Sequence, residues 1–133
     1  MFGIVIITHG NLAKGFRSAA TMIVGEKEIS CIGLYPGHDL EYFERQVRTS
    51  IEEMKQKYQG VIVFTDLMYG TPFNKVSGLM EEIEFEHYTG TNLPILLEVM
   101  VKTETHSIKE VVEELDQYLS NIFIHVNKFL QED

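Results

Sequence analysis

Residues 2–10 read Phe2-Gly3-Ile4-Val5-Ile6-Ile7-Thr8-His9-Gly10, and this stretch decides the fold. Five of its nine residues are β-branched, and polar residues do not alternate with apolar ones. This pattern is typical of a strand that is buried on both faces of a parallel sheet. A helical pattern begins directly after His9-Gly10. His9 is therefore predicted at the carboxyl edge of the sheet, where open α/β proteins place their chemistry.

The alternation of strand and helix continues along the chain. Further strands are predicted at 29–34, 61–65 and 85–89, with amphipathic helices between and after them. Helix starts are predicted at Asn11 and Asp39 as caps, at Thr71-Pro72 as cap and first helical residue, in the segment 90–94, and at Ser107–Glu110 with the spacing of a capping box. The fold class is therefore α/β.

We predict a doubly wound, mostly parallel sheet of strand order 2-1-3-4 with helices on both faces. The segment Ile122–Val126 alternates weakly and is predicted to be a C-terminal antiparallel edge strand. No repeat or linker interrupts the sequence, so residues 1–133 are expected to form a single domain.

Composition limits the function classes. The chain has 11 basic and 20 acidic residues, a net charge of −9, which argues against nucleic acid as a partner. The charge favours attraction to a basic protein surface, although solubility alone explains it equally well. A single cysteine excludes an internal disulfide, and with no signal peptide or spanning segment predicted we expect a cytoplasmic protein.

In the order 2-1-3-4 the switch point lies between the first and third strands, which end at His9 and Asp66. A carboxylate that accepts one ring N–H of a histidine leaves the other nitrogen free as a nucleophile. The helix beginning at Thr71 would add backbone N–H groups and a hydroxyl, and Gly10 and Gly70 would let the backbone approach an anion. These residues suit phosphoryl transfer through phosphohistidine, with no cofactor and no metal ligand set.

The competing interpretation is that His9 is structural and Asp66 only caps a turn. The other histidines, including His87 in the fourth strand, are interpreted as having no role in the site.

Three stretches resemble the IIA component of mannose-type sugar phosphotransferase systems. They are Ile7-Thr8-His9-Gly10, Thr65-Asp66-Leu67 followed by Gly70-Thr71-Pro72-Phe73-Asn74, and Gly90-Thr91-Asn92-Leu93-Pro94. Order, spacing and length agree over nearly the whole chain, without an attached IIB domain. One departure is Met68-Tyr69-Gly70, where the family commonly has an aromatic residue and two glycines before Ser/Thr-Pro.

The resemblance implies that His9 accepts a phosphoryl group on Nε2 from the phosphocarrier protein HPr. It implies transfer onward to the IIB component, which serves the IIC/IID membrane permease. Asp66 would orient and stabilise His9, and Thr71, Gly70 and Gly10 would hold the phosphate. The resemblance also implies a homodimer in which the C-terminal strand crosses to the partner subunit.

Two alternatives remain at this point. One is a regulatory phosphohistidine module of the same fold, and the other is a flavodoxin-like ligand-binding domain without a phosphorelay. The response of function to His9→Ala separates the second alternative from a carrier.

Overall fold

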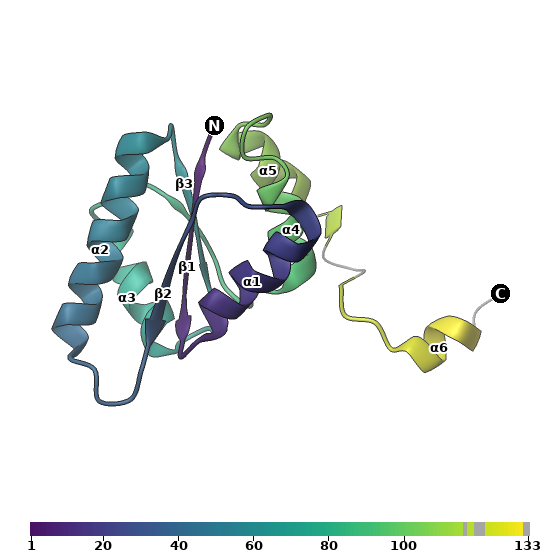
Figure 1. Cartoon of the computed structure of the whole chain (residues 1–133), viewed down its shortest axis with the longest axis horizontal. Helices are drawn as coiled ribbons and strands as arrows, with labels where there is room; N and C mark the ends of the chain where they lie inside the picture. The colour runs from purple at the N-terminus through teal and green to yellow at the C-terminus, as the bar shows by residue number, and fades with distance from the viewer. Residues whose placement is uncertain (116, 119–121, 132–133) are drawn as a thin grey trace.

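The computed structural model describes residues 1–115, 117–118 and 122–131. Strands and helices alternate through most of the chain (Figure 1). The elements are β1 (Gly3–His9), α1 (Leu12–Val24), β2 (Ile29–Leu34), α2 (Leu40–Lys57), β3 (Val61–Thr65), α3 (Thr71–Leu79), β4 (Glu86–Tyr88), α4 (Leu93–Met100), α5 (Ile108–Leu115) and α6 (Val126–Gln131).

The four strands form one parallel sheet of order β2-β1-β3-β4, which confirms the predicted topology. β1 lies between β2 and β3, and Ile7 is paired with both Ile32 and Thr65. The carboxyl ends of β1 and β3 therefore lie side by side. This register brings His9 and Asp66 to the same edge of the sheet.

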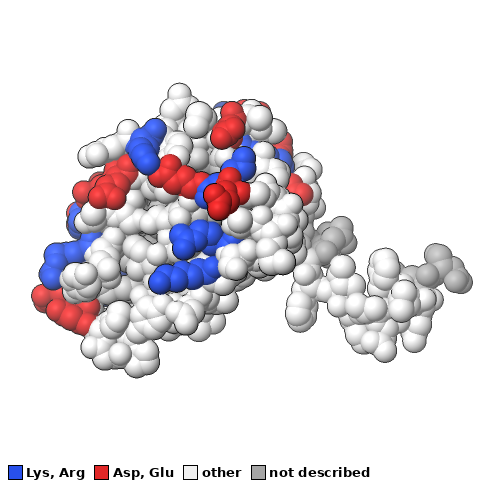
Figure 2. All heavy atoms as spheres, viewed as in Figure 1, with Lys and Arg blue, Asp and Glu red and all other residues white. Residues whose placement is uncertain are grey.

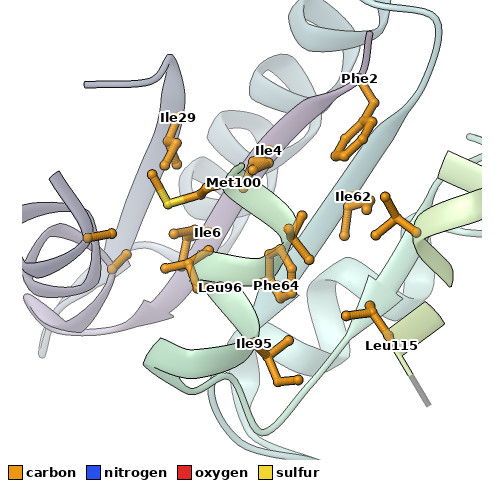
Figure 3. Close-up of a cluster of buried hydrophobic side chains, with 14 residues drawn as sticks. Phe2, Ile4, Ile6, Ile29, Ile62, Phe64, Ile95, Leu96, Met100 and Leu115 are labelled. Atoms are coloured by element: carbon orange, nitrogen blue, oxygen red, sulfur yellow. The ribbon is translucent and has the colours of Figure 1, made fainter. Parts of the chain in front are cut away.

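Helices cover both faces of the sheet because successive side chains of a strand point to opposite sides. Ile4 and Ile6 of β1 pack in a cluster with residues of α1, α4 and α5, which Figure 3 shows from close by. Val5 and Ile7 pack on the other side against α2 and α3. Burial on both faces explains the continuous apolar run of β1.

Three helix starts agree with the sequence patterns. The Asp39 side chain accepts from Glu41 N at the start of α2, and Asn92 Oδ1 accepts from Ile95 N at the start of α4. At α5, Glu110 N donates to Ser107 Oγ, and Ser107 N donates to Glu110 Oε1, completing a capping box.

Two predicted caps are wrong in detail. Asn11 is at the N-cap of α1, but its side chain accepts from the Tyr35 hydroxyl, and Thr8 Oγ1 accepts from Ala13 N instead. The buried Thr8 side chain therefore provides the acceptor for a backbone N–H in the first turn of α1. At α3 the N-cap is Gly70, so Thr71 is the first helical residue rather than the cap.

The predicted antiparallel strand at Ile122–Val126 is wrong. In the described part of the tail, α6 begins at Val126, and residues 123–131 are all exposed. Figure 1 shows α6 standing away from the body of the protein. A strand needs a neighbour for its backbone groups, and the described residues of one chain offer this segment none. The fourth strand, β4, is also shorter than the predicted 85–89.

Among the described residues, no helix combines the length and the apolar character needed to cross a membrane.

Candidate active site

His9 and Asp66 are joined at the carboxyl edge of the sheet. Asp66 Oδ2 lies 2.9 Å from the backbone N of His9 and 2.9 Å from its Nδ1. Because a carboxylate oxygen is only an acceptor, this contact favours the tautomer that carries its proton on Nδ1. The second ring nitrogen, Nε2, then has a free lone pair. The predicted pair is therefore brought together in a geometry that leaves one nitrogen available.

The two side chains differ in their access to solvent. The His9 side chain is 48% exposed, whereas the Asp66 side chain is 11% exposed. The second carboxylate oxygen of Asp66, Oδ1, is buried and has no hydrogen-bond partner among the described residues. Among the described residues, His9 is therefore the one residue that donates hydrogen bonds to this carboxylate, and it does so through Oδ2. Such a carboxylate is placed to stabilise a positive charge on the imidazole ring.

Gly70 lies directly against the His9 ring. A Cβ atom built on Gly70 would be only 2.9 Å from His9 Cε1, closer than real Cβ contacts allow. The absence of a side chain at this position therefore lets the backbone of residues 67–70 approach the imidazole. Gly70 is also the N-cap of α3, and as a glycine it has no side chain that could cap the helix.

The first turn of α3 therefore begins beside the His9 ring, and no N-cap side chain accepts from its backbone N–H groups. The first N–H groups of a helix lack helical acceptors, and they attract anions together with the helix dipole. Thr71 begins this first turn, and Pro72, which has no N–H, follows it. Gly70 is thus placed against His9, and Thr71 follows it as the first residue of the helix.

Gly10 turns the chain from β1 into α1. Its φ is +52°, and its N–H donates to Leu34 O at 2.7 Å. Gly33 of β2 supports this turn, because a Cβ at Gly33 would collide with the carbonyl oxygen of Gly10. The backbone after His9 is therefore held against β2, and Gly33 is a supporting residue that the sequence pattern did not single out.

His87 supports the other side of the site, and the sequence analysis assigned it no role there. Its Nε2 lies 2.8 Å from the hydroxyl of Thr65, the residue before Asp66, and its ring packs against Phe73 of α3 at 5.2 Å between centroids. Burial lowers the pKa of His87 to about 4, so this histidine is neutral near pH 7. The sequence feature that could have indicated this role is the position of His87 in the predicted strand that neighbours the strand before Asp66.

The segments that follow the two predicted site residues carry no carboxylate. Residues 9–15 and 67–75 contain Lys14 and Lys75 and no aspartate or glutamate. On the face drawn in Figure 2, most acidic side chains lie toward the end that carries the N-terminus, away from the carboxyl ends of the strands. The net charge of −9 thus does not prevent a phosphate group from approaching the site.

Comparison with known proteins places these features in a family. A family model described as "PTS system fructose IIA component" (EIIA-man) matches residues 3–116. The "PTS system sorbose-specific EIIA component" of Lacticaseibacillus casei is 31% identical over 114 residues, which cover 84% of this chain and 81% of that protein. The "PTS system fructose-specific EIIA component" of Bacillus subtilis (strain 168) is 24% identical over 117 residues, covering 86% and 80% respectively.

A solved structure agrees with the fold over almost the whole chain. It is the PTS IIA protein associated with the fucose utilization operon from Streptococcus pneumoniae, which is 29% identical and superposes with a TM-score of 0.84, covering 97% of this chain and 96% of that one. The family model spans both β1 with His9 and β3 with Asp66. This chain therefore belongs to the fructose IIA component family of mannose-type phosphotransferase systems, whose members are phosphotransfer carriers in sugar uptake.

Proposed function

We propose that His9 accepts a phosphoryl group on Nε2 and passes it to the next protein of the relay. The observation that carries this proposal is the hydrogen bond between His9 Nδ1 and Asp66 Oδ2 at 2.9 Å. It occupies one ring nitrogen and leaves the lone pair of the other free on a half-exposed ring. The family supplies the direction of transfer: phospho-HPr is the donor and the IIB component is the acceptor.

In the first step the Nε2 lone pair attacks phosphorus, and the bond between phosphorus and the donor nitrogen breaks. The electron pair of that bond stays on the donor histidine, so the transfer itself moves no proton from His9. The His9 ring then carries both the phosphoryl group and the Nδ1 proton, and it shares a positive charge. Asp66 Oδ2 stabilises that charge and keeps the ring oriented. The second step is the reverse reaction with the IIB histidine as nucleophile.

We assign the phosphate cradle to the start of α3 and the turn after β1. Thr71 contributes its backbone N–H and hydroxyl, Gly70 keeps the backbone close to the His9 ring, and Gly10 turns the chain directly after His9. Donors that are fixed before the reaction stabilise the transferring phosphoryl group without reorganisation. No metal is required by this scheme, because the protein supplies the nucleophile and the anion donors itself.

The alternative of a ligand-binding domain without phosphorelay has less support, because the model of the fructose IIA component family matches residues 3–116. A hollow of about 430 Å³ is lined by residues of β2 and α2 such as Ser30, Ser50 and Lys57, and it provides no ligand site at His9 or Asp66. A regulatory phosphohistidine module would use the same chemistry at His9. Permease-coupled sugar phosphorylation with and without the protein separates that role from transport.

The test is phosphorylation by phosphoenolpyruvate, enzyme I and HPr, followed by intact-mass analysis. We expect one acid-labile phosphate on the wild type and on His106→Ala, and none on His9→Ala. ³¹P and ¹⁵N NMR should place the phosphate on Nε2. An unphosphorylated wild type in the presence of phosphorylated HPr refutes the proposal, and so does phosphate retained on His9→Ala.

We also propose a cytoplasmic homodimer that uses the C-terminal tail. Phe123 is fully exposed, and Phe129 and Leu130 are 61% and 74% exposed, which is an unusual apolar surface for a free tail. Sedimentation at micromolar concentration should give a dimer for the wild type and a monomer after Phe129→Ser and Leu130→Ser. A monomeric wild type contradicts the dimer.

A further inference from the structure

Tyr69 has an unfavourable backbone conformation beside the active site. Its φ is +66°, the one positive value at a non-glycine residue in the described part of the chain. Gly70 N donates to Leu67 O at 3.2 Å, closing a four-residue turn in which Tyr69 is the third residue. A positive φ at this place in a turn favours glycine or asparagine and is rare for a bulky residue. The sequence therefore keeps a tyrosine where the backbone disfavours one.

Contacts within the chain hold the tyrosine but do not bury it. Its ring meets Phe73 edge-on at 5.7 Å between centroids, and Asn74 Nδ2 donates to its carbonyl oxygen at 3.3 Å. The residue nevertheless remains 77% exposed, and its neighbours Leu67 and Met68 are 61% and 54% exposed. Burial in the protein's own core therefore does not explain the side chain.

Tyr69 lies in the loop that a phosphoryl donor must approach to reach His9. Tyr69 precedes Gly70, whose backbone lies against the His9 imidazole. Phosphoryl transfer needs the donor and acceptor nitrogens in line on opposite sides of one phosphorus atom. A protein that exchanges a phosphoryl group with the Nε2 atom of His9 must therefore close over the loop of residues 67–70.

We propose that Tyr69 is a docking residue for the histidine-phosphorylated protein that donates to His9. This inference rests on the proposed function of His9. The left-handed backbone and the contact with Phe73 fix the ring in place before the partner arrives, so little conformational freedom is lost on binding. Exposed tyrosines of this kind are frequent among the residues that dominate the affinity of protein interfaces. The expected contact is an apolar surface around the partner's phosphohistidine.

The test compares four variants in steady-state phosphorylation by phospho-HPr. Tyr69→Gly and Tyr69→Asn remove the ring and accept a positive φ, whereas Tyr69→Phe keeps the ring. Met22→Ala is the matched control, because Met22 is 87% exposed near the end of α1 that is farther from His9. Thermal unfolding is measured in parallel to follow the backbone strain.

For Tyr69→Gly and Tyr69→Asn we expect the KM for phospho-HPr to rise about tenfold or more, with kcat at saturating donor within about twofold of the wild type. Tyr69→Phe and Met22→Ala should keep the wild-type KM. Tyr69→Gly should also raise the Tm by roughly 2 to 8 °C, because the strain is relieved. A higher Tm together with a higher KM separates docking from a loss of folding.

An unchanged KM in Tyr69→Gly and Tyr69→Asn overturns the inference while leaving the role of His9 intact. An equally raised KM in Tyr69→Phe overturns the proposed apolar contact of the ring, since the hydroxyl would then make the contact. Failure of the wild type to accept phosphate would instead remove the proposed function itself. The two failures are therefore distinguishable.

Discussion

Replacing Asp66 by asparagine tests the central contact of the site. In the wild type, Asp66 Oδ2 accepts hydrogen bonds from the backbone N and from Nδ1 of His9, both at 2.9 Å. An asparagine oxygen in the same place still accepts both bonds, but without the charge. A hydrogen bond to a charged group contributes about 1.5–3 kcal/mol and a neutral one about 0.5–1.5 kcal/mol, so each bond loses roughly 1 kcal/mol.

The new amide NH₂ has no favourable place. If its oxygen faces His9, the NH₂ occupies the buried position of Oδ1, where the described residues offer no partner. If the amide is reversed, the NH₂ meets the two N–H groups of His9. The bond to the backbone N–H weakens equally in both forms of His9 and cancels, so the loss specific to the positively charged form is that of the Nδ1 bond. This loss of about 1 kcal/mol corresponds to roughly a fivefold smaller equilibrium constant for phosphorylation.

The assay is the fraction of phosphorylated protein at a series of HPr to phospho-HPr ratios, measured by intact mass, with rapid-quench rates in parallel. Asp39→Asn is the matched control, because it makes the same chemical change at the N-cap of α2, where asparagine caps as well as aspartate. We expect this control to behave as the wild type. An Asp66→Asn equilibrium within about twofold of the wild type would refute the electrostatic role of the carboxylate.

Three further predictions follow from the surroundings of the site. Gly70→Ala places a Cβ against His9 Cε1 and should slow phosphorylation about tenfold or more. Its urea midpoint should stay near that of the wild type, because the φ of −75° at this position suits alanine, and an unchanged phosphorylation rate would contradict the close approach. Gly33→Ala collides with the Gly10 carbonyl and should lower the free energy of unfolding by about 1–3 kcal/mol in urea titrations, whereas Gly15→Ala, with open space around it, should not lower it. His87 has a pKa of about 4 in the folded protein, below its ordinary value of 6.5, so between these pH values the unfolded chain binds a proton that the folded protein does not. The contribution of neutral His87 to stability is therefore complete above pH 6.5 and is lost as pH falls toward 4. Allowing for partial exposure, we expect about 1–2 kcal/mol less stability from this residue at pH 4 than at pH 7, a loss that His87→Asn should remove from urea titrations and that an identical pH dependence in both proteins would disprove.

The sequence by itself determined the strands, most helix starts and the two residues of the central pair. These features depend on local properties: the unbroken apolar run of β1, the caps at Asp39 and Asn92, and the order of alternating elements. Because parallel strands of order 2-1-3-4 end at one edge, topology alone placed His9 beside Asp66.

Only the tertiary structure decided how these residues meet. One oxygen of Asp66 serves two N–H groups of a residue 57 positions away, and Gly70 approaches the imidazole ring directly. The left-handed Tyr69 likewise depends on the packing of its loop. The tail shows the converse case: a weak local pattern suggested a strand at 122–126, but a strand forms only beside another strand. Local patterns report backbone preference, whereas contacts between distant segments depend on the packing of the whole fold.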